Sequence, residues 1–344
     1  MMKKVKLGKT GLMVSRVVMG GIPIQRPPFE EATRIVEKAV ELGINFFDTS
    51  IHYHDSELRI GKGVEGHRDN IILATKGSWR DKKTAADCID QSLERLGTDY
   101  IDLWQFHNPG SNEAYDNLFK PGGAYEAAEE ALKEGKILHI GISLHPLDLA
   151  LRAVESGMFE TLQFPFNLVL REAEDRLIPS AAEHDVGFIG MKPFAGGRLT
   201  DPNLAIKFVL QHDNVVPDPG FQSVEEIRQV IEIAEGELTL SEAELGRIEE
   251  IREEVGTRFC RRCGYCMPCP QGVLIPNVMC LPVLYNVWPD DYIPRWGYIK
   301  EVTASADNCV GCGECEDKCP YYLPIREMIA ENMEYHRKYM EARR

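Results

Sequence analysis

The sequence predicts an α/β protein: a (β/α)8 TIM barrel followed by a small cysteine-rich module. Eight apolar runs of strand length recur through about the first 250 residues, which is the usual size of such a barrel. Helical segments that end in turn residues separate these runs. Eight of the ten cysteines then fall in two short runs after residue 257. We therefore predict a barrel domain at 1–256 and a cysteine domain at 257–344.

The N-terminal segment is expected to form a hairpin, a first strand and a first helix. Residues 3–15 place Gly8 and Gly11 near a turn, and residues 16–21 form an apolar run that ends in glycine. Proline is tolerated in the first turn of a helix, so the Pro-Pro pair at 27–28 is expected to start a helix. Gly43 is expected to end that helix as a C-terminal cap.

The same strand-and-helix unit then repeats along the chain. Strands are expected to start near residues 16, 44, 71, 101, 137, 161, 186 and 215. The runs are continuously apolar and do not alternate, as in a parallel sheet covered by helices. A doubly wound sheet is the alternative, but no G-x-G-x-x-G follows any strand. A last long helix is expected to begin with a capping box from Ser241 to Glu244, and a polar helix is expected to end the chain.

Four polar residues arrive in order at or just after the ends of consecutive strands. They are Asp48, Tyr53, Lys76 and His107, here called the polar tetrad. Barrel enzymes carry their chemistry at this end of the strands. Taken singly, Asp48 could cap a helix, Tyr53 could lie in a loop, and His107 could be a core histidine. Their joint order and placement favour one catalytic site.

The chemistry of the polar tetrad suits reduction of a carbonyl group. Such a reduction needs a proton donor for the oxygen, and Tyr53 can serve if its pKa, ordinarily about 10, is lowered. The ammonium of Lys76 would lower it by favouring the phenolate. Asp48 would hold Lys76 charged and oriented. His107 would hydrogen-bond the carbonyl oxygen and align it.

Segments around these residues resemble the aldo-keto reductase family throughout residues 3–255. They are FFDTSIHYHDSELRIGKG, IILATKG, YIDLWQFHNP and GMKPFAGGRL. The resemblance implies that the polar tetrad is catalytic and that a nicotinamide cofactor, usually NADP, lies across the barrel top. It implies cofactor contacts at Ser143, Gln163, Lys192, Gly220 and Ser223. The chain departs from the family pattern at Leu144, Met191 and Val230. NAD, NADP and flavin therefore all stay open as cofactors.

The two cysteine runs point to metal. The first run has its cysteines at 260, 263, 266 and 269, and the second has its cysteines at 309, 312, 315 and 319. The last cysteine of each run is followed by proline. The second run matches the ferredoxin run for a [4Fe–4S] cluster, whose fourth cysteine reaches the other cluster. Structural zinc is the alternative, although zinc sites usually show C-x-x-C pairs with longer gaps. The first run departs from the ferredoxin pattern by having two residues before its last cysteine.

The ferredoxin resemblance implies two [4Fe–4S] clusters with crossed ligands. One set is Cys260, Cys263, Cys266 and Cys319, and the other is Cys309, Cys312, Cys315 and Cys269. The glycines at 264, 311 and 313 would permit a tight backbone approach. A barrel followed by this module resembles the iron–sulfur branch of the aldo-keto reductase family over nearly the whole chain.

Charge and composition limit the classes of partner that the protein is expected to bind. The net charge of -15 disfavours nucleic acid and anionic membrane surfaces. No apolar run approaches a membrane span, and the basic start lacks an apolar signal core, so we expect a cytoplasmic protein. The expected partners are a small carbonyl or alcohol substrate and, as a further candidate, a redox protein.

Three functions fit the sequence. The first is an oxidoreductase that acts at the polar tetrad while the clusters relay electrons. The second is an ordinary NADP-dependent carbonyl reductase whose clusters are structural. The third is a non-enzymatic electron-transfer or redox-sensing protein, which the intact tetrad disfavours. A relay between nicotinamide and clusters needs an intermediary for one- and two-electron steps, which makes flavin a candidate cofactor.

Overall fold

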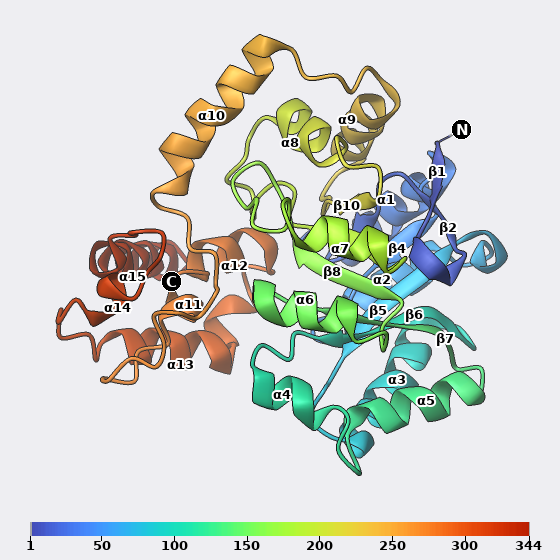
Figure 1. The fold of residues 1–344 in the computed structure, drawn as a ribbon, viewed down its shortest axis with the longest axis horizontal. Coiled ribbons are helices and arrows are strands. Elements are labelled where there is room, and N and C mark those ends of the chain that lie inside the picture. The colour runs from blue at the N-terminus through green and yellow to red at the C-terminus, as the bar shows by residue number, and fades with distance from the viewer. Residues whose placement is uncertain (1, 344) are drawn as a thin grey trace. The chain divides into compact units, whose positions relative to one another are not determined.

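A computed structural model describes residues 2–343 and divides the chain into two compact units (Figure 1). The barrel unit comprises Met1–Glu244 and the cysteine unit comprises Leu245–Arg344. Met1 and Arg344, the outer ends of the two predicted domains, lie outside the described residues. Within residues 2–343, no helix has both the length and the apolar character that a membrane span requires.

A short hairpin precedes the barrel, as predicted. Its strands β1 (Lys4–Lys6) and β2 (Met13–Ser15) pair antiparallel around the 3-10 turn η1 (Gly8–Thr10). Gly8 and Gly11 both have positive φ, at 51° and 73°, a conformation that glycine adopts at little cost. The hairpin register places Val5 opposite Val14.

Eight parallel strands then form the predicted barrel. They are β3 (Met19–Gly20), β4 (Phe46–Asp48), β5 (Ile72–Gly77), β6 (Ile101–His107), β7 (Ile137–Ser143), β8 (Thr161–Pro165), β9 (Gly187–Met191) and β10 (Val215–Asp218). They are hydrogen-bonded in sequence order from β3 to β10. A bridge between Gly20 and Gly220 and the bond from Val18 N to Pro217 O, at 3.0 Å, bring the last strand back to the first. The sheet therefore closes.

Helices follow the strands in alternation. They are α1 (Phe29–Glu41), α2 (Ser56–Gly63), α3 (Lys82–Leu96), α4 (Asn112–Asn117), α5 (Ala124–Lys133), α6 (Leu147–Glu155), α7 (Leu177–Glu183), α8 (Pro202–Val209) and α9 (Val224–Glu235), with 3-10 turns η2 (Pro23–Gln25) and η3 (Arg68–Asn70). Side chains cap several of them: Asp81 accepts from Thr84 N, and Asp201 accepts from Leu204 N. Such caps satisfy donors that a helix start leaves unpaired.

The barrel core explains why the strands read as continuous apolar runs. Every residue of β4 and β5 is buried. Phe46, Leu103 and Ile189 come from different strands and share one buried cluster. Because all strands are parallel, their C-terminal ends lie at one end of the barrel. Polar residues at those ends are therefore brought together.

Helix α10 (Glu242–Gly256) contains the boundary between the two units. It begins with the predicted capping box, because Ser241 N donates to Glu244 Oε2 at 2.9 Å and Glu244 N donates to Ser241 Oγ at 3.3 Å. The predicted domain boundary at residue 256 is the other end of this same helix.

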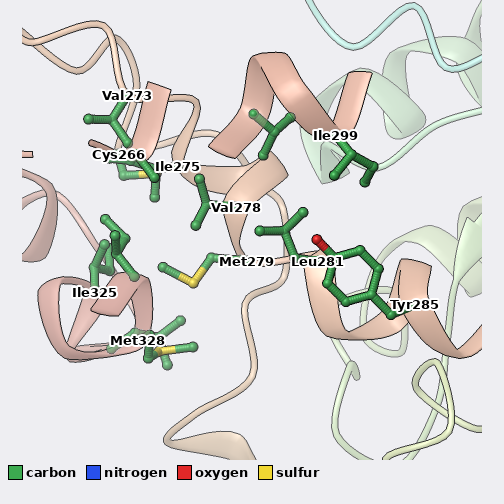
Figure 2. Packing of buried hydrophobic residues seen from close by; sticks show 14 of the residues in the cluster. Cys266, Val273, Ile275, Val278, Met279, Leu281, Tyr285, Ile299, Ile325 and Met328 are labelled. Carbon is green, nitrogen blue, oxygen red and sulfur yellow. The ribbon is translucent and has the colours of Figure 1, made fainter. Parts of the chain in front are cut away.

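The cysteine unit is helical and has its own core. Its elements are α11 (Ile275–Val278), α12 (Leu281–Val287), η4 (Ile293–Arg295), α13 (Gly297–Ala306), α14 (Glu314–Asp317) and α15 (Ile325–Glu341). Figure 2 shows Val278, Leu281 and Tyr285 packed in this core with Ile299. Cys266, one of the predicted cluster ligands, belongs to the same core. The core therefore holds at least one ligand loop against packed helices.

Candidate functional site

The structure brings the polar tetrad together. Asp48 ends β4, Lys76 is the penultimate residue of β5, and His107 ends β6. Tyr53 lies in the loop between β4 and α2. The Lys76 ammonium lies 5.2 Å from the centroid of the Tyr53 ring, and that ring meets His107 edge-on at a centroid distance of 5.6 Å. A strand-end pattern in the sequence thus corresponds to one cluster of side chains.

A buried ion pair anchors this cluster. Lys76 Nζ contacts Asp48 Oδ2 and donates to Thr49 O at 2.6 Å, and both charged side chains are about 2% exposed. Burial favours the neutral amine, but the Asp48 carboxylate, with Tyr53 and Asp218, outweighs that effect and raises the pKa of Lys76. A positive charge is therefore held beside the phenol of Tyr53.

Two glutamine amides fix the Asp48 carboxylate. Gln105 Nε2 donates to Asp48 Oδ1 at 3.1 Å, and Gln163 Nε2 donates to Asp48 Oδ2 at 3.1 Å. Both glutamines are buried. Each oxygen of the carboxylate thus receives an amide N–H in addition to the Lys76 contact. Gln105 was not predicted as a site residue, and only its polar character inside an apolar strand marked it.

Ser50 orients the imidazole of His107. Its hydroxyl lies 2.9 Å from His107 Nδ1 and 2.9 Å from the carbonyl oxygen of Lys76. The hydroxyl has one proton, and the carbonyl can only accept it. Ser50 Oγ therefore accepts from Nδ1, which places an imidazole proton on that nitrogen. Sequence reasoning missed Ser50 because a serine in a loop carries no distinctive signal.

Asp218 is a second buried carboxyl group at this site. It ends β10 and is 9% exposed, and its Oδ2 accepts from Gln163 Nε2 at 2.8 Å. Burial, followed by the charge of Asp48, raises the pKa of Asp218 well above its ordinary value. Sequence reasoning missed this residue. The signal was available, since an acid at the end of an apolar strand is the same pattern that singled out Asp48.

Ser143 and Gln163 are the two predicted cofactor residues that the structure places side by side. They pair in register on β7 and β8, and both are buried. The two carboxyl groups that accept from Gln163 Nε2, those of Asp48 and Asp218, fix the orientation of this amide. Within residues 2–343, Gln163 Oε1 is buried and has no hydrogen-bond partner. An acceptor of this kind fits the NH2 group of a nicotinamide carboxamide.

The other predicted cofactor residues lie farther along the same barrel end. Lys192 follows β9 with φ of 63°, and its Nζ lies 2.8 Å from His145 Nε2. Gly220 follows β10, where an added Cβ would meet Pro23 Cδ at 2.4 Å. Ser223 caps α9 by accepting from Glu226 N at 3.2 Å. The first turn of α9 also carries two glutamates, so a phosphate there would meet negative charge.

The eight predicted ligand cysteines line two pockets in the cysteine unit. The first pocket has about 390 Å³ of empty volume, and its cysteines are Cys266, Cys269, Cys309, Cys312 and Cys315. The second has about 370 Å³, and its cysteines are Cys260, Cys263, Cys266 and Cys319. Each pocket contains three cysteines of one run and the last cysteine of the other, and Cys266 lines both pockets. This arrangement fits the crossed ligand sets that the ferredoxin resemblance implies.

The local chemistry of the pockets also fits soft metal clusters. Burial raises the pKa of Cys260 to about 12 and that of Cys266 to about 11, so these thiols need a bound cation to ionise near neutral pH. Gly264, Gly311 and Gly313 have φ of 84°, 71° and 88°, a conformation that suits the turns of ligand loops. Across residues 2–343, no group of three or more His, Cys, Asp or Glu side chains is placed to hold a single metal ion.

Two family models match the chain. The model of the aldo/keto reductase family matches residues 16–204, and that of the 4Fe-4S dicluster domain matches residues 259–324. The first match contains the whole polar tetrad. The second contains all eight predicted ligand cysteines.

Individual relatives and solved structures match more than half of the chain. "Uncharacterized oxidoreductase YqkF" of Bacillus subtilis (strain 168) is 28% identical over 76% of this chain and 92% of its own length. "L-galactose dehydrogenase" of Arabidopsis thaliana is 34% identical over 57% of this chain and 66% of its own length. Among solved structures, the aldo-keto reductase AKR11C1 from Bacillus halodurans in its holo form superposes with a TM-score of 0.64 at 27% identity. That match covers 73% of this chain and 96% of the other.

Proposed function

Because the chain belongs to the aldo/keto reductase family and carries a 4Fe-4S dicluster domain, we propose that it interconverts a carbonyl group and an alcohol at the polar tetrad. In this proposal, two [4Fe–4S] clusters relay electrons, and the nicotinamide cofactor is NADP(H). The barrel is that of an NAD(P)H-linked oxidoreductase. The observation that carries the proposal is the buried Lys76 ammonium, which Asp48 holds beside the Tyr53 ring.

Tyr53 is the proton donor for the substrate oxygen. When hydride reaches the carbonyl carbon, the oxygen gains negative charge and must take a proton. A phenol gives up its proton more readily when a fixed ammonium group stabilises the phenolate. The pairing of Lys76 with Asp48 keeps that ammonium charged in a buried site. For alcohol oxidation the same phenolate accepts the proton.

His107 aligns the substrate oxygen. Its ring lies edge-on to Tyr53, and Ser50 fixes its orientation through Nδ1. A hydrogen-bonding group set in advance at the reacting oxygen lowers the barrier without reorganisation during the reaction. Because Nδ1 donates to Ser50, His107 reaches the substrate through Nε2, which accepts from an alcohol hydroxyl when the ring is neutral and donates to a carbonyl oxygen when the ring is an imidazolium. Tyr53 and the imidazolium form of His107 would therefore bind the same carbonyl oxygen.

The nicotinamide, when bound, supplies or accepts the hydride. Gln163 would hold its carboxamide through Oε1, with the neighbouring Ser143 hydroxyl as a second contact. The residue that would bind the cofactor is therefore in direct contact with the polar tetrad, because the Gln163 side chain also donates to the Asp48 carboxylate. The relatives carry names of both kinds, a reductase and a dehydrogenase, which agrees with a site that works in either direction.

The cysteine unit would supply one-electron chemistry. Each of its two pockets offers four or more cysteines, and Cys266 lines both, so two clusters would be close neighbours. Two neighbouring clusters would allow electrons to pass from one cluster to the other, whereas a single cluster would be enough to stabilise the fold. Exchange with nicotinamide would require an intermediary such as flavin, and delivery elsewhere would require a redox protein partner. The alternative is an ordinary NADP-dependent reductase with structural clusters.

We predict that Gln163→Leu weakens NADP+ binding about tenfold or more, because a lost hydrogen bond that strands a buried partner costs about 1–3 kcal/mol. Calorimetry with NADP+ and with NAD+ measures this and ranks the two cofactors. Gln105→Leu is the matched control, since it also removes an amide donor from Asp48. Wild-type affinity in Gln163→Leu would contradict the assignment, and equal weakening in both variants would show that the effect passes through Asp48.

A further inference from the structure

The carboxyl groups of Asp48 and Asp218 both interact with the ammonium group of Lys76. Gln163 Nε2 bridges them, at 3.1 Å from Asp48 Oδ2 and 2.8 Å from Asp218 Oδ2. One amide nitrogen that donates to both brings the two buried carboxyl groups close together, so a proton on one of them would let it donate to the other. In the described part of the chain, the positive charge that acts on both is the Lys76 ammonium. Two buried carboxylates against one ammonium would leave an uncompensated charge, which is costly.

The surroundings of Asp218 indicate which carboxyl group carries the proton. Asp48 on β4 and Lys76 on β5 are the ionisable groups that act on it, and Gln163 on β8 is its amide partner. The neighbouring β3 presents Gly20, and β9 presents Met191 in register with Asp218. Asp48 receives Lys76 and two amide N–H groups, whereas Asp218 receives one amide N–H. The negative charge therefore rests on Asp48 and the proton on Asp218.

We propose that Asp218 is a positioning residue that stays a neutral acid, donates a hydrogen bond to Asp48, and so limits the negative charge facing Lys76 to one carboxylate. This inference rests on the proposed function, since its effect is exerted through Lys76 on Tyr53. The proton shared by the two carboxyl groups also fixes Asp48 in the orientation that holds Lys76.

The consequence for the reaction is electrostatic. Proton transfer from Tyr53 to the substrate oxygen creates a phenolate. With Asp218 neutral, the phenolate and Asp48 face one ammonium. With Asp218 ionised, a third negative charge joins them in a buried site, which opposes formation of the phenolate. Ionisation of Asp218 at alkaline pH should therefore slow carbonyl reduction.

The test compares Asp218→Asn with wild type in NADPH-dependent reduction of 4-nitrobenzaldehyde, followed as kcat/KM against pH. Asparagine keeps an acceptor for Gln163 and a donor for Asp48 but cannot ionise. We expect the alkaline loss of kcat/KM in wild type to move up by about one pH unit or more in Asp218→Asn. Asp218→Leu should show the same shift with a lower plateau, because it removes the hydrogen bonds too. An unchanged alkaline limb in Asp218→Asn would overturn the proposal.

Infrared difference spectroscopy at pH 7 tests the proton without turnover. We expect the C=O stretching band of a protonated carboxylic acid in wild type, its loss in Asp218→Asn, and its retention in Tyr53→Phe. No change of this band in Asp218→Asn would overturn the inference. A wild-type protein that shows the band but leaves the aldehyde unreduced would instead count against the proposed function, so the two failures are distinguishable.

Discussion

Tyr53→Phe is expected to lower carbonyl reduction by about 10²- to 10⁴-fold, the usual contribution of a positioned general acid. Phenylalanine keeps the ring that packs beside Lys76 and His107 but cannot give a proton to the substrate oxygen. The buried Lys76–Asp48 pair stays intact, so the fold should be retained. Steady-state rates with NADPH and an aldehyde, together with the thermal unfolding midpoint, measure both effects.

The control for this variant is Tyr322→Phe, which removes a hydroxyl from a tyrosine that is 91% exposed in the cysteine unit. It should leave the rate unchanged. Cluster absorbance and calorimetric NADP+ binding should be the same in both variants as in wild type. A Tyr53→Phe protein that keeps more than about one tenth of the wild-type rate would show that another group donates the proton.

Removal of single cysteines is expected to remove one cluster at a time, in a crossed pattern. Cys319→Ala should lower the iron content by about half, because only one of two four-iron sites loses a ligand. The double variant Cys260→Ala/Cys319→Ala should lose no more iron, since both residues line one pocket. Cys309→Ala/Cys319→Ala should lose both clusters, since these residues line different pockets.

Iron analysis and electron paramagnetic resonance of the reduced proteins measure this pattern. Cys280→Ala is the control, because Cys280 lines neither pocket. It should keep both clusters. If each run held its own cluster, Cys309→Ala/Cys319→Ala would lose only one cluster, and the crossed assignment would be wrong.

Much of the barrel could be predicted from local sequence pattern. Most residues of the barrel strands are buried on both faces of the sheet, so the strands read as apolar runs, and turn residues mark where helices end. The β5 segment is buried throughout, and the capping box at Ser241 starts α10 as expected. Parallel strands also place their C-terminal ends together, which is why the positions of Asp48, Lys76 and His107 along the chain suffice to group them.

The supporting residues of the site could not be predicted in the same way. Gln105, Gln163 and Asp218 meet at Asp48 from three different strands. Strand register and closure of the barrel decide which side chains contact one another inside the barrel. Neither can be predicted from a local sequence pattern. Ser50 acts on His107 through a loop whose path is set by the folded strands. These contacts decide where charge and protons lie.

The most direct test of an oxidoreductase that couples nicotinamide to clusters is an anaerobic titration of the whole protein with NADPH, followed by cluster absorbance. We predict that NADPH bleaches the cluster absorbance toward the level that dithionite reaches, and any flavin in the protein would show in the same spectra. Bleaching by dithionite but not by NADPH, in a protein to which NADP+ binds, would contradict the relay. It would leave an ordinary reductase whose clusters are structural.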